Sequence, residues 1–366
     1  MKHMSERKLA TIRTISSIAD IPGKDRIGLA MVDGWSVIVQ KSDFKVGDLC
    51  GYCEIDSILP DAEWTAFLKD RRIRTMKMAG CISQGICFPM SILPKDQTFL
   101  VGDDVTDVLG ITKYEHFDTD ELPAKKVREA KPPKYPAFLM RMWWFRRLVG
   151  KFHGKYFDKA FPTWISKTDE ERIQNCPFYL NLNKAWVLTE KLDGSSATYA
   201  IRKTHKRFGP KYEYIICSRN VRLYTPDGRA YWTVYEKYHI KDVLTVLIRK
   251  LDTDYVILQG EVIGPGVQGN KYRLKEHCFY CFNFITDGTG RWSSADGKRM
   301  VEPYGISWVP IVDVGELPDT VEEMLDKAHG KSLIADTIRE GLVCRSLDGK
   351  FSFKAVDPLF LLKWKE

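Results

Sequence analysis

Lys191 ends an apolar stretch and is followed two and three residues later by Asp193 and Gly194. A lysine amine is a nucleophile only when it is neutral, so a lysine that does chemistry needs surroundings that lower its pKa. A glycine beside it lets the backbone turn tightly against a bound group. Alone, however, this pattern is more often a surface turn, and average residue usage places Lys-x-Asp-Gly by chance in roughly one chain of this size in ten.

Five further patterns follow Lys191 along the chain. They are Ser218-Arg219-Asn220, Gln259 to Gly264 around Glu261, Phe279 to Asn283 with Tyr280 and Phe282, Glu340-Gly341-Leu342-Val343, and Phe353-Lys354. Taken singly, each has an ordinary explanation, such as a solvated acid at a strand end, a salt-bridged surface arginine or a buried aromatic strand.

In their order, the six patterns resemble motifs I, Ia, III, IIIa, IV and V of the covalent nucleotidyltransferases, a superfamily of DNA ligases, RNA ligases and mRNA capping enzymes. Six independent coincidences would be needed otherwise, so the resemblance outweighs the ordinary explanations. It implies that Lys191 attacks the α-phosphorus of a nucleotide, with its pKa lowered by nearby cations and a metal ion. It also implies that Lys354 binds the α-phosphate and that Glu340 holds Mg²⁺ or Mn²⁺, directly or through water.

The same resemblance implies a set of nucleotide-binding residues. Arg219 would meet the ribose or a phosphate, and Glu261 would accept a hydrogen bond from a ribose hydroxyl. An aromatic residue of motif IIIa would stack on the purine; by register we favour Phe282, with Tyr280 next. Glu190 precedes the nucleophile, where the family often contacts the adenine amino group through a side-chain or backbone acceptor. ATP rather than GTP follows from the resemblance, because an aromatic ring stacks on either purine.

Two positions depart from the family pattern. Many RNA ligases have a second motif V lysine two residues after the first, where this chain has Val356, and Lys363 is the candidate replacement. Phage-type RNA ligases place asparagine where Ser196 stands, so contacts to the leaving pyrophosphate can differ.

The elements that would position these residues fall into three parts. Residues 1–110 contain about five short strands separated by turn residues, with a hairpin signal at Asp33-Gly34, which predicts a small Greek-key barrel of the OB type. Its basic run Arg71 to Lys77 is typical of a strand that follows a phosphate backbone, and equally of a charged edge strand.

Residues 111–180 are rich in proline and lysine and indicate a basic linker that joins or forms part of the next domain. Within it, residues 138–148 predict a basic aromatic helix that either contacts nucleic acid or packs on that domain. Residues 181–366 alternate strands with helices. The predicted fold class is therefore α+β: an OB-type barrel, then an α+β nucleotidyltransferase (ATP-grasp-like ligase) domain built on antiparallel sheets.

The order of the domains indicates the branch of the superfamily. DNA ligases and capping enzymes carry an OB domain after motif V, whereas here only Ala355 to Glu366 follow Lys354 and the barrel comes first. This order, and the run Ile82 to Ile86, resemble the ATP-dependent RNA ligases of the type 5 branch. The resemblance implies that AMP passes from Lys191 to an RNA 5′-phosphate and that a 3′-hydroxyl then seals the strand. The expected substrate is a nicked duplex with a ribonucleotide 3′-OH end.

Two alternatives stay open at this point. One is another enzyme of the superfamily, a DNA ligase or a capping-type guanylyltransferase. The other is a non-catalytic nucleic-acid-binding protein with a vestigial transferase domain. The net charge of +8 suits a polyanionic partner without requiring one.

Composition limits the compartment. No apolar run approaches the roughly 18 residues of a membrane span and no leader opens the chain, so we expect no membrane association. Nine scattered cysteines predict free thiols in a reducing, intracellular compartment. The pairs Cys50/Cys53 and Cys278/Cys281 lie in strand-like stretches. Residues three apart on a strand face opposite sides, which favours buried thiols over a zinc site.

Overall fold

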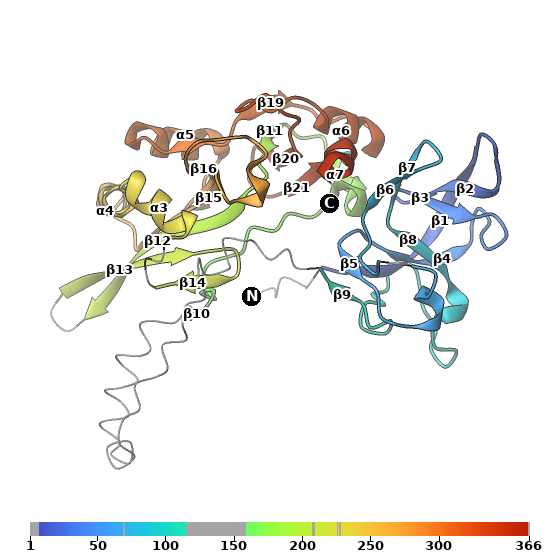
Figure 1. Ribbon diagram of the computed structural model, residues 1–366. Coiled ribbons are helices and arrows are strands. Elements are labelled where there is room, and N and C mark those ends of the chain that lie inside the picture. Colours follow the sequence, from blue (N-terminus) through green and yellow to red (C-terminus); the bar gives the residue numbers. More distant parts are fainter. Residues whose placement is uncertain are drawn as a thin grey trace, which may run out of the picture.

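The structure is a computed structural model that describes residues 7–114 and 159–364, except residues 69, 207–208, 225 and 227. Most of the segment 111–180, including the helix expected at 138–148, lies outside the described residues. The described residues form two bodies that lie side by side, an N-terminal barrel and a larger α+β body (Figure 1). None of the described helices is long and apolar enough to cross a membrane.

The barrel is built on a curled antiparallel sheet in the order β3-β2-β1-β4-β8. Its strands are β1 (Ala10–Ile21), β2 (Lys24–Val32), β3 (Trp35–Gln40), β4 (Leu49–Cys53) and β8 (Ile86–Pro89); β5 (Ser57–Ile58) pairs with β9 (Thr112–Lys113), and β6 (Thr75–Met78) with β7 (Cys81–Gln84). Register shifts after Ile15 and Asp20 bend β1 as β-bulges do. The predicted hairpin is confirmed, because Val32 pairs with Trp35 across the turn.

The basic run Arg71 to Lys77 is only partly a strand. Strand β6 begins at Thr75, and Ile73 before it is buried in the barrel core. Arg72 turns back to Asp56, with Nη2 3.0 Å from Oδ1, and its guanidinium lies 3.5 Å from the ring centroid of Tyr114. The prediction of one continuous basic strand is therefore wrong. The first part of the run precedes β6, and Arg72 pairs with a carboxylate of the barrel instead of lying on a basic strand.

The α+β body contains two sheets, antiparallel throughout except where β18 pairs with β16. The larger has the order β10-β14-β13-β12-β15-β16-β17, with β18 beside β16, and the smaller the order β19-β11-β20-β21. The strands are β10 (Lys159–Ala160), β11 (Trp186–Lys191), β12 (Ser195–Lys206), β13 (Gly209–Cys217), β14 (Val221–Leu223), β15 (Tyr255–Ile263), β16 (Cys278–Thr286), β17 (Gly290–Arg291), β18 (Ser307–Trp308), β19 (Ile311–Gly315), β20 (Gly341–Ser346) and β21 (Ser352–Val356). Both Cys-x-x-Cys pairs lie on strands, β4 and β16, as predicted.

Helices cover these sheets. They are α3 (Ala230–Lys237), α4 (Ile240–Lys250), α5 (Ser294–Val301), α6 (Val321–Ala328) and α7 (Pro358–Trp364). The apolar face of α4 repeats every three to four residues, at Ile240, Val243, Leu244 and Leu247, and lies in the core of the larger sheet. Helix α6 packs on the smaller sheet through Met324 and Ala328. The predicted α+β class with antiparallel sheets is confirmed.

The two bodies share apolar and polar contacts. Phe360 and Leu361 of α7 belong to the barrel core, and α7 lies between the bodies in Figure 1. Beside them, Asn175 of the short helix η3 (Ile173–Asn175) donates to Glu54 at 2.6 Å and accepts from Trp35 Nε1 at 3.0 Å. Buried polar groups are costly unless they are paired, so this satisfied cluster specifies one mutual orientation of the bodies.

Candidate active site

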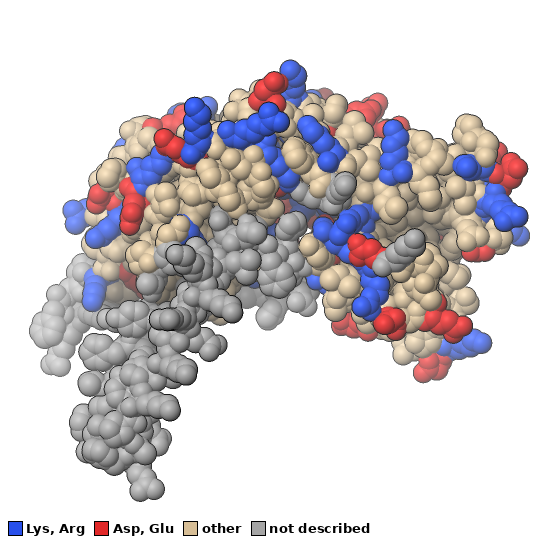
Figure 2. Space-filling view, in the orientation of Figure 1, with Lys and Arg blue, Asp and Glu red and all other residues tan. Residues whose placement is uncertain are grey.

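A cavity of about 320 Å³ lies where the two bodies meet, a size that suits a small ligand. The α+β body contributes the ends of β11, β15, β20 and β21, and the barrel contributes Arg7, Asp56 and Lys113. Figure 2 shows Lys and Arg side chains mixed with acids on the barrel side of the hollow between the bodies. All seven residues singled out from the sequence line this cavity: Glu190, Lys191, Arg219, Glu261, Phe282, Glu340 and Lys354.

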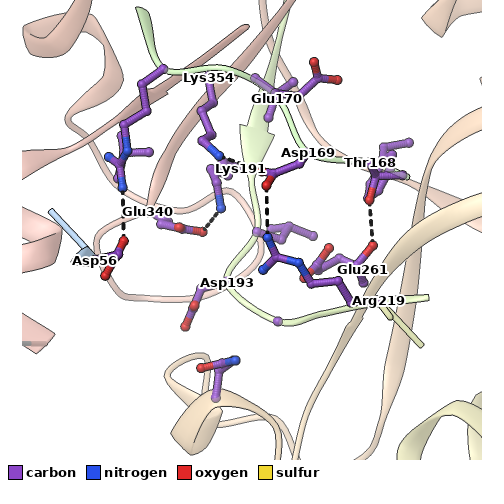
Figure 3. Close-up of a pocket in the computed structure, with 18 of the residues that line it drawn as sticks. Asp56, Thr168, Asp169, Glu170, Lys191, Asp193, Arg219, Glu261, Glu340 and Lys354 are labelled. Carbon is purple, nitrogen blue, oxygen red and sulfur yellow. Dashed lines mark hydrogen bonds and ion pairs between the residues drawn. The ribbon is translucent and has the colours of Figure 1, made fainter. Parts of the chain in front are cut away.

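Lys191 and Glu340 face each other across paired strands. Strand β11 ends at Lys191, which pairs in register with Gly341, and Lys191 Nζ donates to Glu340 Oε2 at 2.6 Å. Glycine is required at 341: its φ is +154°, and a Cβ there would lie 2.1 Å from the Ala355 carbonyl oxygen of β21. The close packing of β20 on β21 thus places Glu340 against the lysine (Figure 3).

The pKa of Lys191 lies above its ordinary value. Burial alone would lower it, but the charge and hydrogen bond of Glu340, with Glu261 and Asp193, outweigh burial. The sequence predicts a lowered pKa for Lys191, whereas the carboxylates of this cavity raise it. The protein alone holds the amine as a charged partner of Glu340.

Glu261 is the second carboxylate in front of the lysine. Burial raises the pKa of Glu261 to about 8; the positive charge of Lys191 opposes this shift, and Glu340 adds to it. Strand β12 lies close enough to β15 for this geometry only because residue 194 is glycine, since a Cβ there would come within 2.4 Å of the Val262 carbonyl oxygen. The glycine three residues after Lys191 thus has a packing reason as well.

Asp193 is the third carboxylate that acts on Lys191, after Glu340 and Glu261. Lys271 Nζ approaches Asp193 Oδ2 at 2.6 Å, and the Asp193 backbone N–H donates to Tyr272 Oη at 2.7 Å. The ammonium of Lys271 also lies 5.0 Å from the ring centroid of Phe360 on α7. The loop between β15 and β16 therefore ties Asp193 to the helix that packs into the barrel.

Lys354 and Arg219 meet on the opposite side of the cavity, at the carboxylate of Asp169. Lys354 Nζ is 2.9 Å from Asp169 Oδ1, and Arg219 Nη2 is 3.3 Å from Oδ2 (Figure 3). Burial lowers the pKa of Lys354 to about 8, against the pull of Asp169 and with the help of Arg172. The cavity thus has a carboxylate side around Lys191 and a cationic side around Lys354.

Phe282 lies where the sequence places it, whereas the Glu190 side chain is engaged by a neighbouring loop. Phe282 lines the cavity, and Arg345 Nη1 donates to its carbonyl at 2.9 Å; Tyr280 does not appear among the lining residues. The Glu190 carboxylate accepts from Ser332 Oγ at 2.5 Å and from the Leu333 backbone N–H at 2.8 Å. Both its oxygens are therefore used to hold the loop at 332–333, and an adenine contact through this side chain would have to displace one of these bonds.

Sequence reasoning missed the cationic and acidic residues that other segments bring to the cavity. They include Arg7, Lys113, Asp169 and Arg172. The acid-rich run that contains Asp169 carries no periodicity, and nothing local in the barrel sequence marks Arg7 or Lys113. The candidate replacement Lys363 is exposed on α7 and does not line the cavity.

Comparisons with known proteins agree with this geometry. A family model described as RNA ligase matches residues 184–365, and a model described as an OB-fold domain matches residues 9–90. A mutant of Naegleria gruberi RNA ligase with ATP and Mn is 32% identical, with a TM-score of 0.78 over 98% of this chain and 100% of that chain. The chain belongs to the RNA ligase family.

Two further structures of the same relative support the assignment of this RNA ligase. An apo mutant is 33% identical, with a TM-score of 0.79 over 98% of each chain, and a complex with PPi is 32% identical, with a TM-score of 0.79 over 98% of this chain and 99% of that one. No curated protein matches the chain. The OB-type barrel and the RNA ligase prediction are confirmed, and family membership excludes the DNA ligase, capping and non-catalytic alternatives.

Proposed function

We propose that this ATP-dependent RNA ligase works through Lys191 in three transfers. The Lys191 amine bonds to the α-phosphorus of ATP and pyrophosphate leaves; the AMP then passes to an RNA 5′-phosphate; and a 3′-hydroxyl attacks that phosphate and expels AMP. The observation that carries the proposal is one cavity that holds Lys191 between carboxylates on one side and Lys354 and Arg219 on the other. Such an arrangement places cations where the negative charge of a phosphate would develop.

A divalent cation fits the carboxylate side. Among the described residues no cluster of three or more His, Cys, Asp or Glu side chains could hold a metal by itself. Mg²⁺ and Mn²⁺ need fewer, because Mg²⁺ is usually held by one or two carboxylates together with water and substrate phosphates. Glu340 and Glu261 would supply these oxygens. A cation bound to Glu340 would neutralise the negative charge that raises the pKa of the Lys191 amine. The relative with ATP and Mn supports this assignment.

Arg172 is the best candidate for binding the leaving pyrophosphate. Its side chain is buried and lines the cavity, and among the described residues its Nε and Nη1 have no hydrogen-bond partner. Its Nη2 lies 3.8 Å from Asp56 Oδ2. Unpaired nitrogens on a buried guanidinium are costly, and phosphate oxygens are the acceptors that it binds best. The relative solved with PPi supports pyrophosphate binding by this chain.

The preferred RNA is, in our proposal, a nicked duplex whose 3′ end is a ribonucleotide. The barrel-first domain order supports it, as does the run Ile82 to Ile86, which joins β7 to β8 through Gly85 at a φ of +97°. We expect a 5′-phosphate nick with one ribonucleotide at its 3′ end to be sealed with ATP and Mg²⁺ much faster than an otherwise identical all-DNA nick. Denaturing gels of labelled strands measure this, and equal rates on the two nicks would contradict the preference while leaving the ligase assignment standing.

Phe282→Ala should weaken ATP binding, whereas Tyr280→Ala should not. Stacking on a base is worth about 1–3 kcal/mol, so the loss corresponds to roughly 5- to 150-fold in Kd. The two residues lie two apart on β16, whose pairing with β15 shifts register at Phe282, between Cys281 and Asn283. Only Phe282 of the two lines the cavity. ATP titrations of the two variants compare them directly, and a larger loss in Tyr280→Ala would move the adenine contact to that residue.

A further inference from the structure

Three cations from three distant parts of the chain converge on the carboxylate of Asp169. Lys354 comes from β21 at 2.9 Å, Arg219 follows β13 at 3.3 Å, and Lys113 comes from β9 of the barrel at 3.8 Å. Figure 3 shows Lys354 and Arg219 turned toward Asp169 from opposite sides. Burial alone would raise the pKa of Asp169, but these cations hold it below its ordinary value, so the carboxylate is ionised.

Two of these cations, Lys354 and Arg219, are residues that the proposed function assigns to nucleotide binding. Carboxylate and phosphate oxygens make equivalent charge-assisted hydrogen bonds to lysine and arginine. We propose that Asp169 is a resident counter-anion: its carboxylate holds Lys354, Arg219 and Lys113 together in the nucleotide-free enzyme and competes with the nucleotide phosphate for them. This inference rests on the proposed function for the identity of the phosphate that displaces the carboxylate.

The role belongs to Asp169 and not to acids of its segment in general. Glu170 turns to a different partner, since its Oε1 lies 3.3 Å from Arg345 Nη2 and its Oε2 accepts from Ser352 at 2.5 Å. Glu171 accepts from Asn175 Nδ2 at 2.8 Å. Among the described residues of this acidic run, only Asp169 therefore pairs with Lys354, Arg219 and Lys113.

Loss of the carboxylate has two opposite consequences. The three cations would keep their charge with less compensation, so an incoming phosphate would meet a more positive site and no internal competitor. The same cations would also repel one another and lose their common anchor, so they would be less well aligned on the reacting phosphate. Asp169 is thus a positioning residue. Its removal should tighten phosphate binding but slow the reaction.

The test is AMP binding without divalent metal, because the α-phosphate is the group assigned to Lys354. AMP is titrated calorimetrically, with chelator and at pH 6 to keep Lys354 protonated, into three full-length proteins: Lys191→Ala, which cannot carry covalent AMP, and the same protein with Asp169→Asn or Glu170→Gln added. We expect Asp169→Asn to tighten the Kd at least threefold and Glu170→Gln to leave it unchanged. An unchanged or weaker Kd in the Asp169→Asn protein overturns the proposal.

The rate supplies the second measurement. With Lys191 intact and ATP saturating, Asp169→Asn should slow single-turnover lysine adenylylation about tenfold, which is about 1.4 kcal/mol, through loss of alignment. Asp169→Glu keeps the charge and should bind AMP as the parent does, which separates charge from folding if Asp169→Asn is unstable. Tighter AMP binding in Asp169→Glu would contradict the role of the charge. If the proposed function is wrong, the protein with Lys191 intact would stay unmodified in the adenylylation assay, with no lysyl-AMP.

Discussion

Lys191→Ala should abolish the transfer of label from α-³²P-labelled ATP to the protein, by about 10⁴-fold or more, because a covalent pathway has no substitute for its nucleophile. Among the described residues, the other two lysines that line the cavity are committed elsewhere, since Lys354 pairs with Asp169 at 2.9 Å and Lys113 pairs with it at 3.8 Å. The measurement is incubation with labelled ATP and Mg²⁺ or Mn²⁺, followed by a denaturing gel, on which only a covalent adduct keeps its label.

Two controls separate lost chemistry from lost folding. Lys184→Ala removes a lysine just before the opposite end of β11, where it pairs with Asp348 at 2.7 Å, and should label normally. The Lys191→Ala protein should also still seal a nick whose 5′ end already carries AMP, because the last transfer forms no bond to the lysine. Normal labelling of Lys191→Ala would refute the covalent mechanism at this residue, and loss of label in Lys184→Ala would point to a folding defect.

The order of motifs was readable from the sequence because each motif lies at or near the end of a strand. Lys191 ends β11 and Glu340 directly precedes β20, so pairing of these two strands alone brings the two residues together. Apolar runs with turn residues predict such strands well, and the stretch Tyr255 to Leu258 is indeed part of β15. Sequence reasoning could therefore predict the chemistry of residues that lie at the ends of neighbouring strands.

The cationic side of the cavity was not accessible in the same way. Lys113 and Arg7 reach the cavity only because the barrel docks through α7 and Asn175, and no local pattern encodes that docking. The pKa shift that the carboxylates of the cavity impose on Lys191 was not accessible for a related reason. A sequence shows which charged residues exist, whereas the direction of a pKa shift depends on which of them lie within a few ångströms in a buried site. The domain boundaries near 110 and 181 stay predictions.

Glu340→Gln should slow lysine adenylylation about 10³-fold. In the structure Glu340 is buried and bonds to Lys191 Nζ at 2.6 Å, which keeps the amine charged and unreactive. If Glu340 also holds the divalent cation, binding of that cation relieves the ion pair and stabilises the charge that develops on the phosphate. A metal contributes several kcal/mol of this kind, and about 4 kcal/mol corresponds to 10³-fold in rate.

The dependence on metal concentration decides between the two roles of Glu340. A glutamine keeps the length and a hydrogen-bonding oxygen but loses the charge that attracts a cation, so the Glu340→Gln protein should need far more Mn²⁺ for half-maximal labelling. Glu340→Asp should recover part of the rate at high Mn²⁺, and Glu276→Gln, which alters an exposed partner of Lys237, should change neither rate nor metal dependence. A slow Glu340→Gln protein with unchanged metal dependence would instead mean that Glu340 positions the Lys191 side chain without holding the cation, which would then have to be held by Glu261 and the nucleotide.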